Sequence, residues 1–135
     1  MNEFEKGYVA GIIDGEGTVS LVRIHASDKF RAPNVEVTST TYEILEKLKE
    51  ICNGGTICKV TKREEHYKQA YKWNIRYDKA IDVLKEVSDF LLEPSKKARA
   101  KFIIEVYKNV TPRNGKYSEE KLKAKMAFEE KFFTL

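Results

Sequence analysis

One short stretch, residues 8–17, constrains this chain most because it combines two helical faces of opposite kind. Its large apolar residues recur at helical spacing and predict a buried face: Tyr8, Val9, Ile12 and Ile13. Small residues within it and just before it form a second face, on which glycine recurs every fourth position: Gly7, Ala10, Gly11 and Gly15. Each glycine inside a helix costs about 1 kcal/mol relative to alanine, but small residues at this spacing let another backbone approach closely. The stretch therefore predicts a helix–helix contact, beside which Gly15 and Gly17 end the helix and hold Asp14 and Glu16.

The same stretch carries a family resemblance. Residues 9–17, VAGIIDGEG, resemble the nine-residue signature of the LAGLIDADG homing endonucleases, with Glu16 at the last acidic position. The motif occurs once, so the resemblance is to the single-motif members, which work as homodimers. It implies a dimer interface on the small-residue face, formed by Gly7, Ala10, Gly11 and Asp14. The alternative is an ordinary amphipathic helix with a glycine C-cap.

Length and composition set the class of the protein. A chain of 135 residues forms one domain, residues 1–135, with a sizeable core. With 34% charged and 41% hydrophobic residues it reads as globular and soluble, and no apolar run is long enough to span a membrane. Without a signal-peptide pattern, we expect an intracellular protein in the cytoplasm or an organelle of its host. Cys52 and Cys58 fit no zinc or disulfide spacing.

The order of predicted elements is helix, two strands, helix, two strands and three helices. A helix over residues 3–15 precedes strands 18–25 and 30–39, in which Pro33 suggests a late start or a kink. A second helix opens with a capping box of Thr40 and Glu43 and leads to strands 56–63 and 70–77. Asp78, Ser95 and Ser118 are expected to begin the last three helices. Strand pairs separated by helices indicate an α+β fold: an αββαββα core with an antiparallel β-sheet saddle and extra C-terminal helices.

One face of such a sheet packs on helices and the other stays free. The free face is expected to carry mixed donors and acceptors, which suit base edges in the major groove of DNA. Because neither face of strand 18–25 is uniformly apolar, a bulge would be needed to settle its parity. The expected base-facing residues are Arg23, His25, Arg31, Asn34, Glu36, Lys59, Thr61, Arg63, Lys72, Asn74 and Arg76. Lysines at the loop tips are expected to contact phosphates: Lys29, Lys62 and Lys68.

The acidic end of the first helix suggests phosphodiester hydrolysis, which needs a metal to neutralise phosphate and activate water. Hard cations such as Mg²⁺ take oxygen ligands, often few of them from protein. We expect Glu16 as the metal ligand, with the backbone carbonyl of Gly15 as a second. Asp14, one step earlier, is expected first to support the helix end and only then to bind metal.

The resemblance also implies catalytic residues outside the motif. A lysine before the fourth helix would stabilise developing charge or orient water, and it maps to Lys96, with Lys97 as the alternative. A polar residue after the second strand maps to Ser39, where many relatives carry glutamine; a serine would act only through water.

Taken together, the sequence and the resemblance imply an intron-encoded homodimer that uses Mg²⁺ to cut both strands of a long, nearly palindromic site in double-stranded DNA. One alternative is a non-catalytic binder on the same scaffold, either an RNA maturase or a transcription regulator. Another is an α+β dimer that binds a protein, which leaves the six basic residues between Lys59 and Arg76 unexplained.

Overall fold

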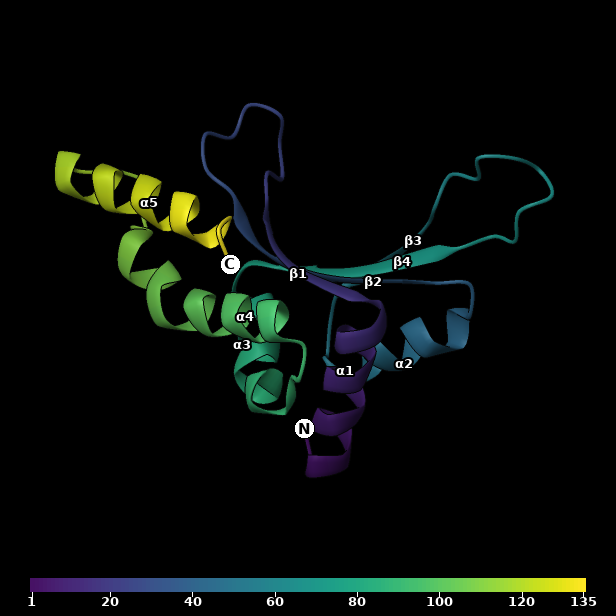
Figure 1. Ribbon diagram of the computed structural model, residues 1–135. Helices are drawn as coiled ribbons and strands as arrows, with labels where there is room; N and C mark the ends of the chain where they lie inside the picture. The colour runs from purple at the N-terminus through teal and green to yellow at the C-terminus, as the bar shows by residue number, and fades with distance from the viewer.

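The computed structural model describes residues 1–135, and its elements follow the order expected from the sequence. The chain forms helices α1–α5, strands β1–β4 and two short 3₁₀ helices, η1 and η2 (Figure 1). The bounds in chain order are α1 Glu3–Glu16, β1 Gly17–Val22, β2 Ala32–Ser39, α2 Tyr42–Ile51, β3 Thr56–Lys59, β4 Tyr71–Arg76, α3 Tyr77–Val87, η1 Ser88–Phe90, α4 Pro94–Val106, η2 Tyr107–Val110 and α5 Glu119–Phe132.

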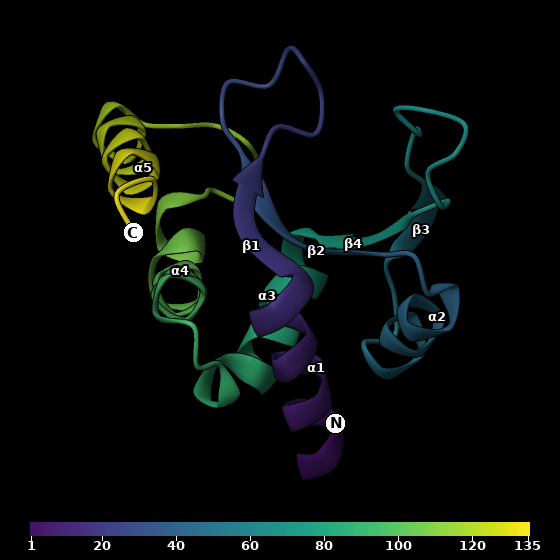
Figure 2. The ribbon, with the colours of Figure 1, turned by 45° about the vertical axis from the view of Figure 1, so that its right-hand side comes forward.

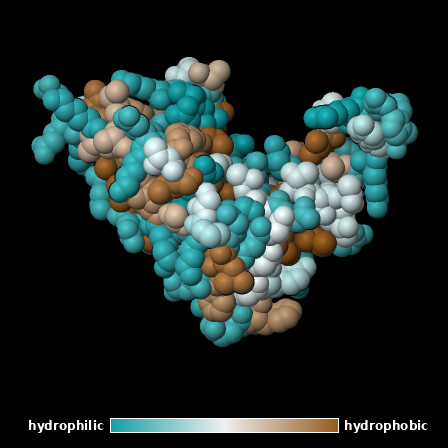
Figure 3. Space-filling model, in the orientation of Figure 1, coloured by the Kyte–Doolittle hydropathy of each residue, from teal (hydrophilic) through white to brown (hydrophobic).

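The four strands form one antiparallel sheet in the order β1-β2-β4-β3. Helices α1 to α4 cover one face, and the loops between β1 and β2 and between β3 and β4 rise on the other side from opposite ends (Figures 1 and 2). The register explains this arrangement. Strand β2 begins at the β1–β2 loop, and its last residue, Ser39, pairs with Tyr71, the first residue of β4 after the β3–β4 loop. The two loops therefore flank a hollow over the free face of the sheet (Figure 3).

The core lies between the sheet and helices, as strand alternation requires. The inward sheet residues Val19, Leu21, Val35, Val37, Trp73 and Ile75 are all buried. They belong to one cluster with residues of α1, α2, α3 and α4, and the indole N–H of Trp73 donates to the carbonyl of Gly54 at 3.0 Å. Pro33 lies within β2, contrary to expectation. It is tolerated there because pairing with β4 starts only at Asn34.

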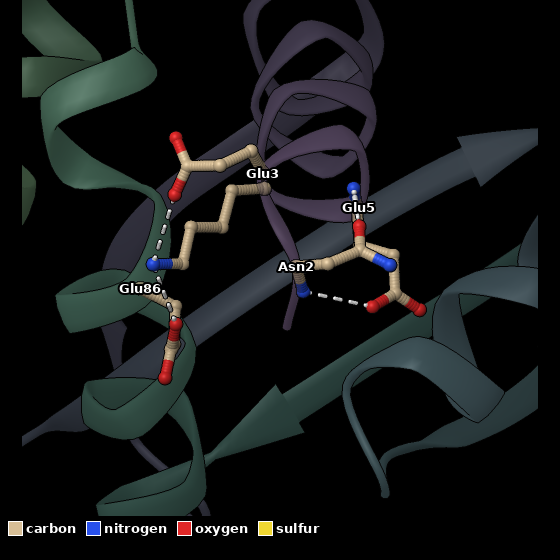
Figure 4. Close-up of polar contacts among 5 residues, drawn as sticks. Asn2, Glu3, Glu5 and Glu86 are labelled. Carbon is tan, nitrogen blue, oxygen red and sulfur yellow. Dashed lines mark hydrogen bonds and ion pairs between the residues drawn. The ribbon is translucent and has the colours of Figure 1, made fainter.

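Helix caps differ from prediction more than the helices themselves. The first helix starts with a capping box of Asn2 and Glu5, and Lys6 pairs with Glu3 and with Glu86 of α3 (Figure 4). Thr40 and Asp78 are not caps: α2 follows Thr41, and α3 follows Arg76. Ser95 is not a cap either.

At α4 the cap is Glu93. Its side chain accepts the N–H groups of Ser95 and Lys96, with Pro94 in the first turn. The prediction for α5 is confirmed, since Ser118 accepts the N–H of Lys121. No helix combines the length and apolar character needed to cross a bilayer.

The last helix, α5, is attached to the segment between β1 and β2 by charged groups. The carboxylate of Glu129 accepts both the backbone N–H and the guanidinium of Arg31, each at 2.8 Å. Lys125 is only 1% exposed; its ammonium donates to Thr111 at 2.6 Å and lies 4.1 Å from the centre of the Tyr107 ring. A cationic group is thus held in the contact between α5 and η2.

Burial of Lys125 makes stability depend on pH in a defined window. Desolvation lowers the pKa of Lys125 from 10.5 to about 8, against the opposing attraction of Glu129. Between these values the unfolded chain binds more protons than the folded chain, so the free energy of unfolding rises with pH. We expect urea midpoints to be higher at pH 9.5 than at pH 7.5, with the Lys125 contribution absent in Lys125→Met. The exposed-site control Lys123→Met should keep the wild-type slope, and an unchanged slope in Lys125→Met would contradict the assignment.

Candidate functional site

The site is built at the junction where α1 runs directly into β1. Gly17 starts β1, and a Cβ placed there would lie 2.7 Å from the Cα of Ile13 and 3.3 Å from the carbonyl oxygen of Glu36. Only glycine therefore lets the helix turn so tightly into the sheet. Glu16, the last residue of α1, is delivered to this junction with its side chain exposed.

The carboxylate of Asp14 is bonded to the segment before α4. It accepts the backbone N–H of Leu92 at 3.0 and 3.2 Å and that of Glu93 at 3.0 Å. Three backbone N–H groups already bond to its two oxygens, so the metal-ligand assignment of Asp14 stays a prediction that this contact does not test. The expectation that it supports the end of the helix is the part that fits this geometry.

Lys96 lies at the same end of α1. Its ammonium donates to the carbonyl oxygens of Ile13 and Asp14 at 2.9 and 2.8 Å. These carbonyls belong to the last turn, where helix dipoles favour a cation. The α1 sequence has no basic residue of its own there. The structure thus brings Lys96 to the acidic motif, as the resemblance implies, but with its ammonium bonded to backbone carbonyls.

Ser39 ends β2 beside this junction. Val37 pairs with Gly17, so Ser39 lies two residues further on at the same end of the β1–β2 pair. Its hydroxyl oxygen accepts the N–H of Thr41 at 3.0 Å. The hydroxyl proton remains available for a water molecule.

The metal-binding capacity of one chain is small. No group of three or more acidic, histidine or cysteine side chains that could hold a metal exists. Glu16 offers one free carboxylate, and Gly15 next to it is exposed. That donor set fits Mg²⁺, which takes one or two carboxylates and completes its shell with waters and phosphate oxygens.

The small-residue face of α1 is open. A Cβ at Gly7, Gly11 or Gly15 would meet nothing within 4 Å. Ala10 is only 1% exposed and packs in the core with Val9 and Ile13, which corrects its assignment to this face. The helical rotation places Ala10 with the inward apolar residues.

Two exposed apolar side chains that the sequence reasoning missed lie near the open glycines. Phe4 is 76% exposed, one turn before Gly7, and stacks on Tyr8 with ring centres 6.1 Å apart. Leu92 is 83% exposed, and its N–H bonds to Asp14. Phe4 could have been found from its spacing to Gly7 and Tyr8. Leu92 could not, since only the fold brings it to α1.

The free face of the sheet is identified by the strand register. Buried Val19, Val35 and Ile75 oppose one another on the helix side, so the residues between them point to the hollow. The free-face residues are Thr18, Ser20, Val22, Ala32, Asn34, Glu36, Thr38, Thr56, Cys58, Lys72, Asn74 and Arg76. Five of the residues expected on this face share it by register, Asn34, Glu36, Lys72, Asn74 and Arg76, and their contact with bases stays a prediction. The sequence reasoning missed the other free-face residues, Thr18, Ser20, Val22, Ala32, Thr38, Thr56 and Cys58, which alternation from the buried residues would have found.

Several predicted base-facing residues lie elsewhere because two strands are shorter than expected. Strand β1 pairs continuously and ends at Val22, so no bulge is needed and Arg23 and His25 belong to the loop. The guanidinium of Arg23 donates to the carbonyl of Asp28, and the His25 N–H donates to the Asp28 carboxylate. Strand β3 ends at Lys59.

Three corrections concern the remaining cations and their neighbours. Lys59 shares a face with Ile57, on the helix side of the sheet. Thr61 and Arg63 lie in the β3–β4 loop with Lys62 and Lys68, as Lys29 does in the β1–β2 loop. Arg31 precedes β2, and its guanidinium is bonded to Glu129. These residues therefore flank the hollow or lie outside it.

Polar groups at the centre of the free face bond to one another. Glu36 accepts the amide N–H of Asn34 at 3.4 Å and lies 4.0 Å from the ammonium of Lys72. The side-chain oxygen of Asn74 accepts the Thr56 hydroxyl at 3.3 Å. Asn34 and Asn74 are 1% and 8% exposed, whereas Arg76 is exposed. The amides of Asn34 and Asn74 are therefore covered, and the accessible polar groups of this face are those of Lys72, Arg76, the threonines and Glu36, its single acid.

Comparison with models of known protein families finds no match, and comparison with curated proteins finds none either. Solved structures do match. The homing endonuclease I-CvuI, in complex with its target in the presence of Ca, has a TM-score of 0.73 and 18% identity over 98% of this chain and 84% of its own. The archaeal intron-encoded homing endonuclease I-Vdi141I, complexed with DNA, has a TM-score of 0.62 and 18% identity over 98% and 84%.

A longer neighbour shows a different coverage. The LAGLIDADG homing endonuclease I-GzeII, in complex with its DNA target, has a TM-score of 0.67 and 17% identity over 92% of this chain but only 43% of its own. The VAGIIDGEG motif lies in α1 and in the junction that leads into the sheet. The chain therefore has the fold of the LAGLIDADG homing endonucleases.

Proposed function

We propose that this chain, as a homodimer, is a Mg²⁺-dependent endonuclease that cuts both strands of a long, nearly palindromic site in double-stranded DNA. The observation that carries the proposal is the junction of α1 with β1: it combines an open glycine face with one exposed carboxylate, Glu16, beside a hollow lined by donors and acceptors. Each feature is incomplete alone. A second copy on the glycine face completes the interface and adds a second Glu16.

The dimer follows from the open face of α1. Gly7, Gly11 and Gly15 lie bare along one side, with Phe4 and Leu92 exposed nearby. A two-fold axis along this face brings two copies of α1 together. Two-fold protein symmetry is mirrored in the symmetry of the DNA site. Coverage of less than half of I-GzeII supports two copies acting together. The names of neighbours such as I-Vdi141I support an intron-encoded origin.

The chemistry assigns a part to each residue of the junction. Glu16 would hold Mg²⁺ with the carbonyl of Gly15, and the bound ion would neutralise phosphate charge and activate water. Lys96 holds the end of α1 through the carbonyls of Ile13 and Asp14 and adds positive potential there. Ser39 can orient a water through its hydroxyl proton. The free-face residues would read bases, and Lys29, Lys62 and Lys68 would contact phosphates.

The test is selection from a randomised duplex library. The wild-type chain is incubated with the library and Mg²⁺, and the ends of cut molecules are sequenced. We expect a recurring, nearly symmetric site whose cleavage stops with chelator. Binding to that duplex should weaken steeply with salt, because phosphate contacts release counterions. Binding without cleavage in Mg²⁺ or Mn²⁺ would instead show the non-catalytic binder, and no salt-dependent binding would overturn both.

A further inference from the structure

A closed ring of hydrogen bonds joins the end of α1 to the start of α4. The carboxylate of Asp14 accepts the N–H groups of Leu92 and Glu93. The carboxylate of Glu93 accepts the N–H groups of Ser95 at 3.2 Å and Lys96 at 2.7 Å. The ammonium of Lys96 returns to the carbonyls of Ile13 and Asp14. We call the three side chains of Asp14, Glu93 and Lys96 the helix clasp.

Glu93 lies between the two helices and bonds to each of them. Its backbone N–H donates to Asp14 of α1, and its side chain caps α4. Asp14 and Lys96 each cross the gap from one side. Removing the Glu93 carboxylate would leave two N–H groups without their acceptor, which loosens the first turn of α4 from which Lys96 projects.

The clasp ends one residue short of the junction that carries Glu16. The carbonyl of Ile13 accepts both the Lys96 ammonium and the N–H of Gly17, so the same oxygen closes the ring and fixes the first residue of β1. Glu16 lies between, and its side chain is exposed. Because few groups pack around that side chain, the position of its carboxylate depends on the position of the backbone.

We propose that Glu93 is a positioning residue for Glu16, acting through Asp14 and Lys96 on the last turn of α1. The cleavage measurement that tests this proposal rests on the proposed function. Groups that orient a metal ligand typically change metal affinity or activity 10- to 100-fold when they are removed. Glu93→Ala should therefore raise the Mg²⁺ concentration for half-maximal cleavage by about tenfold. Affinity for the selected duplex, measured in Ca²⁺, should not change.

The test compares four proteins on the duplex recovered by selection. Glu93→Asp keeps a carboxylate that can cap N–H groups two and three residues on, so it should restore the wild-type Mg²⁺ dependence. Glu105→Gln removes one exposed carboxylate from the same helix and should have no effect. If Glu93→Ala weakens duplex binding and cleavage in equal proportion, or if Glu93→Asp fails to restore the Mg²⁺ dependence, Glu93 does not position the site.

A second measurement does not depend on cleavage. Amide hydrogen exchange of the free protein should be faster at Gly15, Glu16 and Gly17 in Glu93→Ala than in wild type, with wild-type rates in Glu93→Asp and Glu105→Gln. Unchanged rates in Glu93→Ala would overturn the clasp. If the wild-type chain cuts no duplex, the proposed function fails, and exchange alone still decides whether Glu93 holds the end of α1.

Discussion

Glu16→Gln should lower cleavage of the selected duplex by at least about 100-fold while leaving duplex binding intact. The amide has the same shape as the carboxylate, and Glu16 is exposed, so neither the fold nor the sheet surface changes. What is lost is the negative charge that would hold Mg²⁺ at the end of α1. Single-turnover cleavage at saturating protein measures the chemical step, and duplex affinity in Ca²⁺ measures binding.

The matched control is Glu105→Gln, an exposed carboxylate on α4 that should cut as wild type does. A Glu16→Gln protein that cuts at the wild-type rate would show that the metal is held elsewhere. Equal loss of binding and cleavage would place Glu16 in DNA binding and not in the hydrolysis.

Gly11→Leu should have opposite effects on the single chain and on the dimer. Within the chain nothing lies within 4 Å of a Cβ at Gly11. Leucine in place of glycine also stabilises a helix by about 1 kcal/mol, because its helix propensity is higher. In the proposed dimer the new side chain stands between two closely packed copies of α1. We expect a folded, monomeric protein in sedimentation with cleavage reduced to background.

The control for added bulk is Ala124→Leu on the exposed side of α5, which should stay dimeric and active. A Gly11→Leu protein that remains a dimer and still cuts would contradict the interface on this face of α1. A protein that fails to fold would contradict the expectation that the single chain is stable without its partner.

The sequence predicted those parts of the fold that depend on local pattern. The α1 motif and the order of elements both follow from spacing and alternation. The predicted caps of α2, α3 and α4 were wrong. Tyr77 starts α3 with a positive φ of 58°. Glu93 caps α4 and Pro94 follows it in the first turn, whereas the neighbouring Ser95 is the cap that the sequence predicts.

The site was less predictable because several of its contacts join residues far apart in the chain. From the sequence, Arg31 is expected to be a surface cation facing DNA. Its guanidinium is instead bonded to Glu129 of α5, which lies 98 residues away in the chain. Lys96 and Asp14 were singled out, but their backbone partners follow only from how α4 meets α1. The face assignment of Lys59 needed the register of a strand that is only four residues long.

The open glycine face of α1 also makes the proposed activity depend on the concentration of the protein in the cell. Helix α1 carries three glycines and is packed against the rest of the chain on one side. A partner that covers its other side stabilises the folded chain, so dimer formation and the free energy of unfolding are linked by mass action. In the proposed dimer the thermal midpoint would therefore climb with protein concentration. The cutting species would grow with the square of the monomer level, so that a cell making few copies would hold mostly idle single chains.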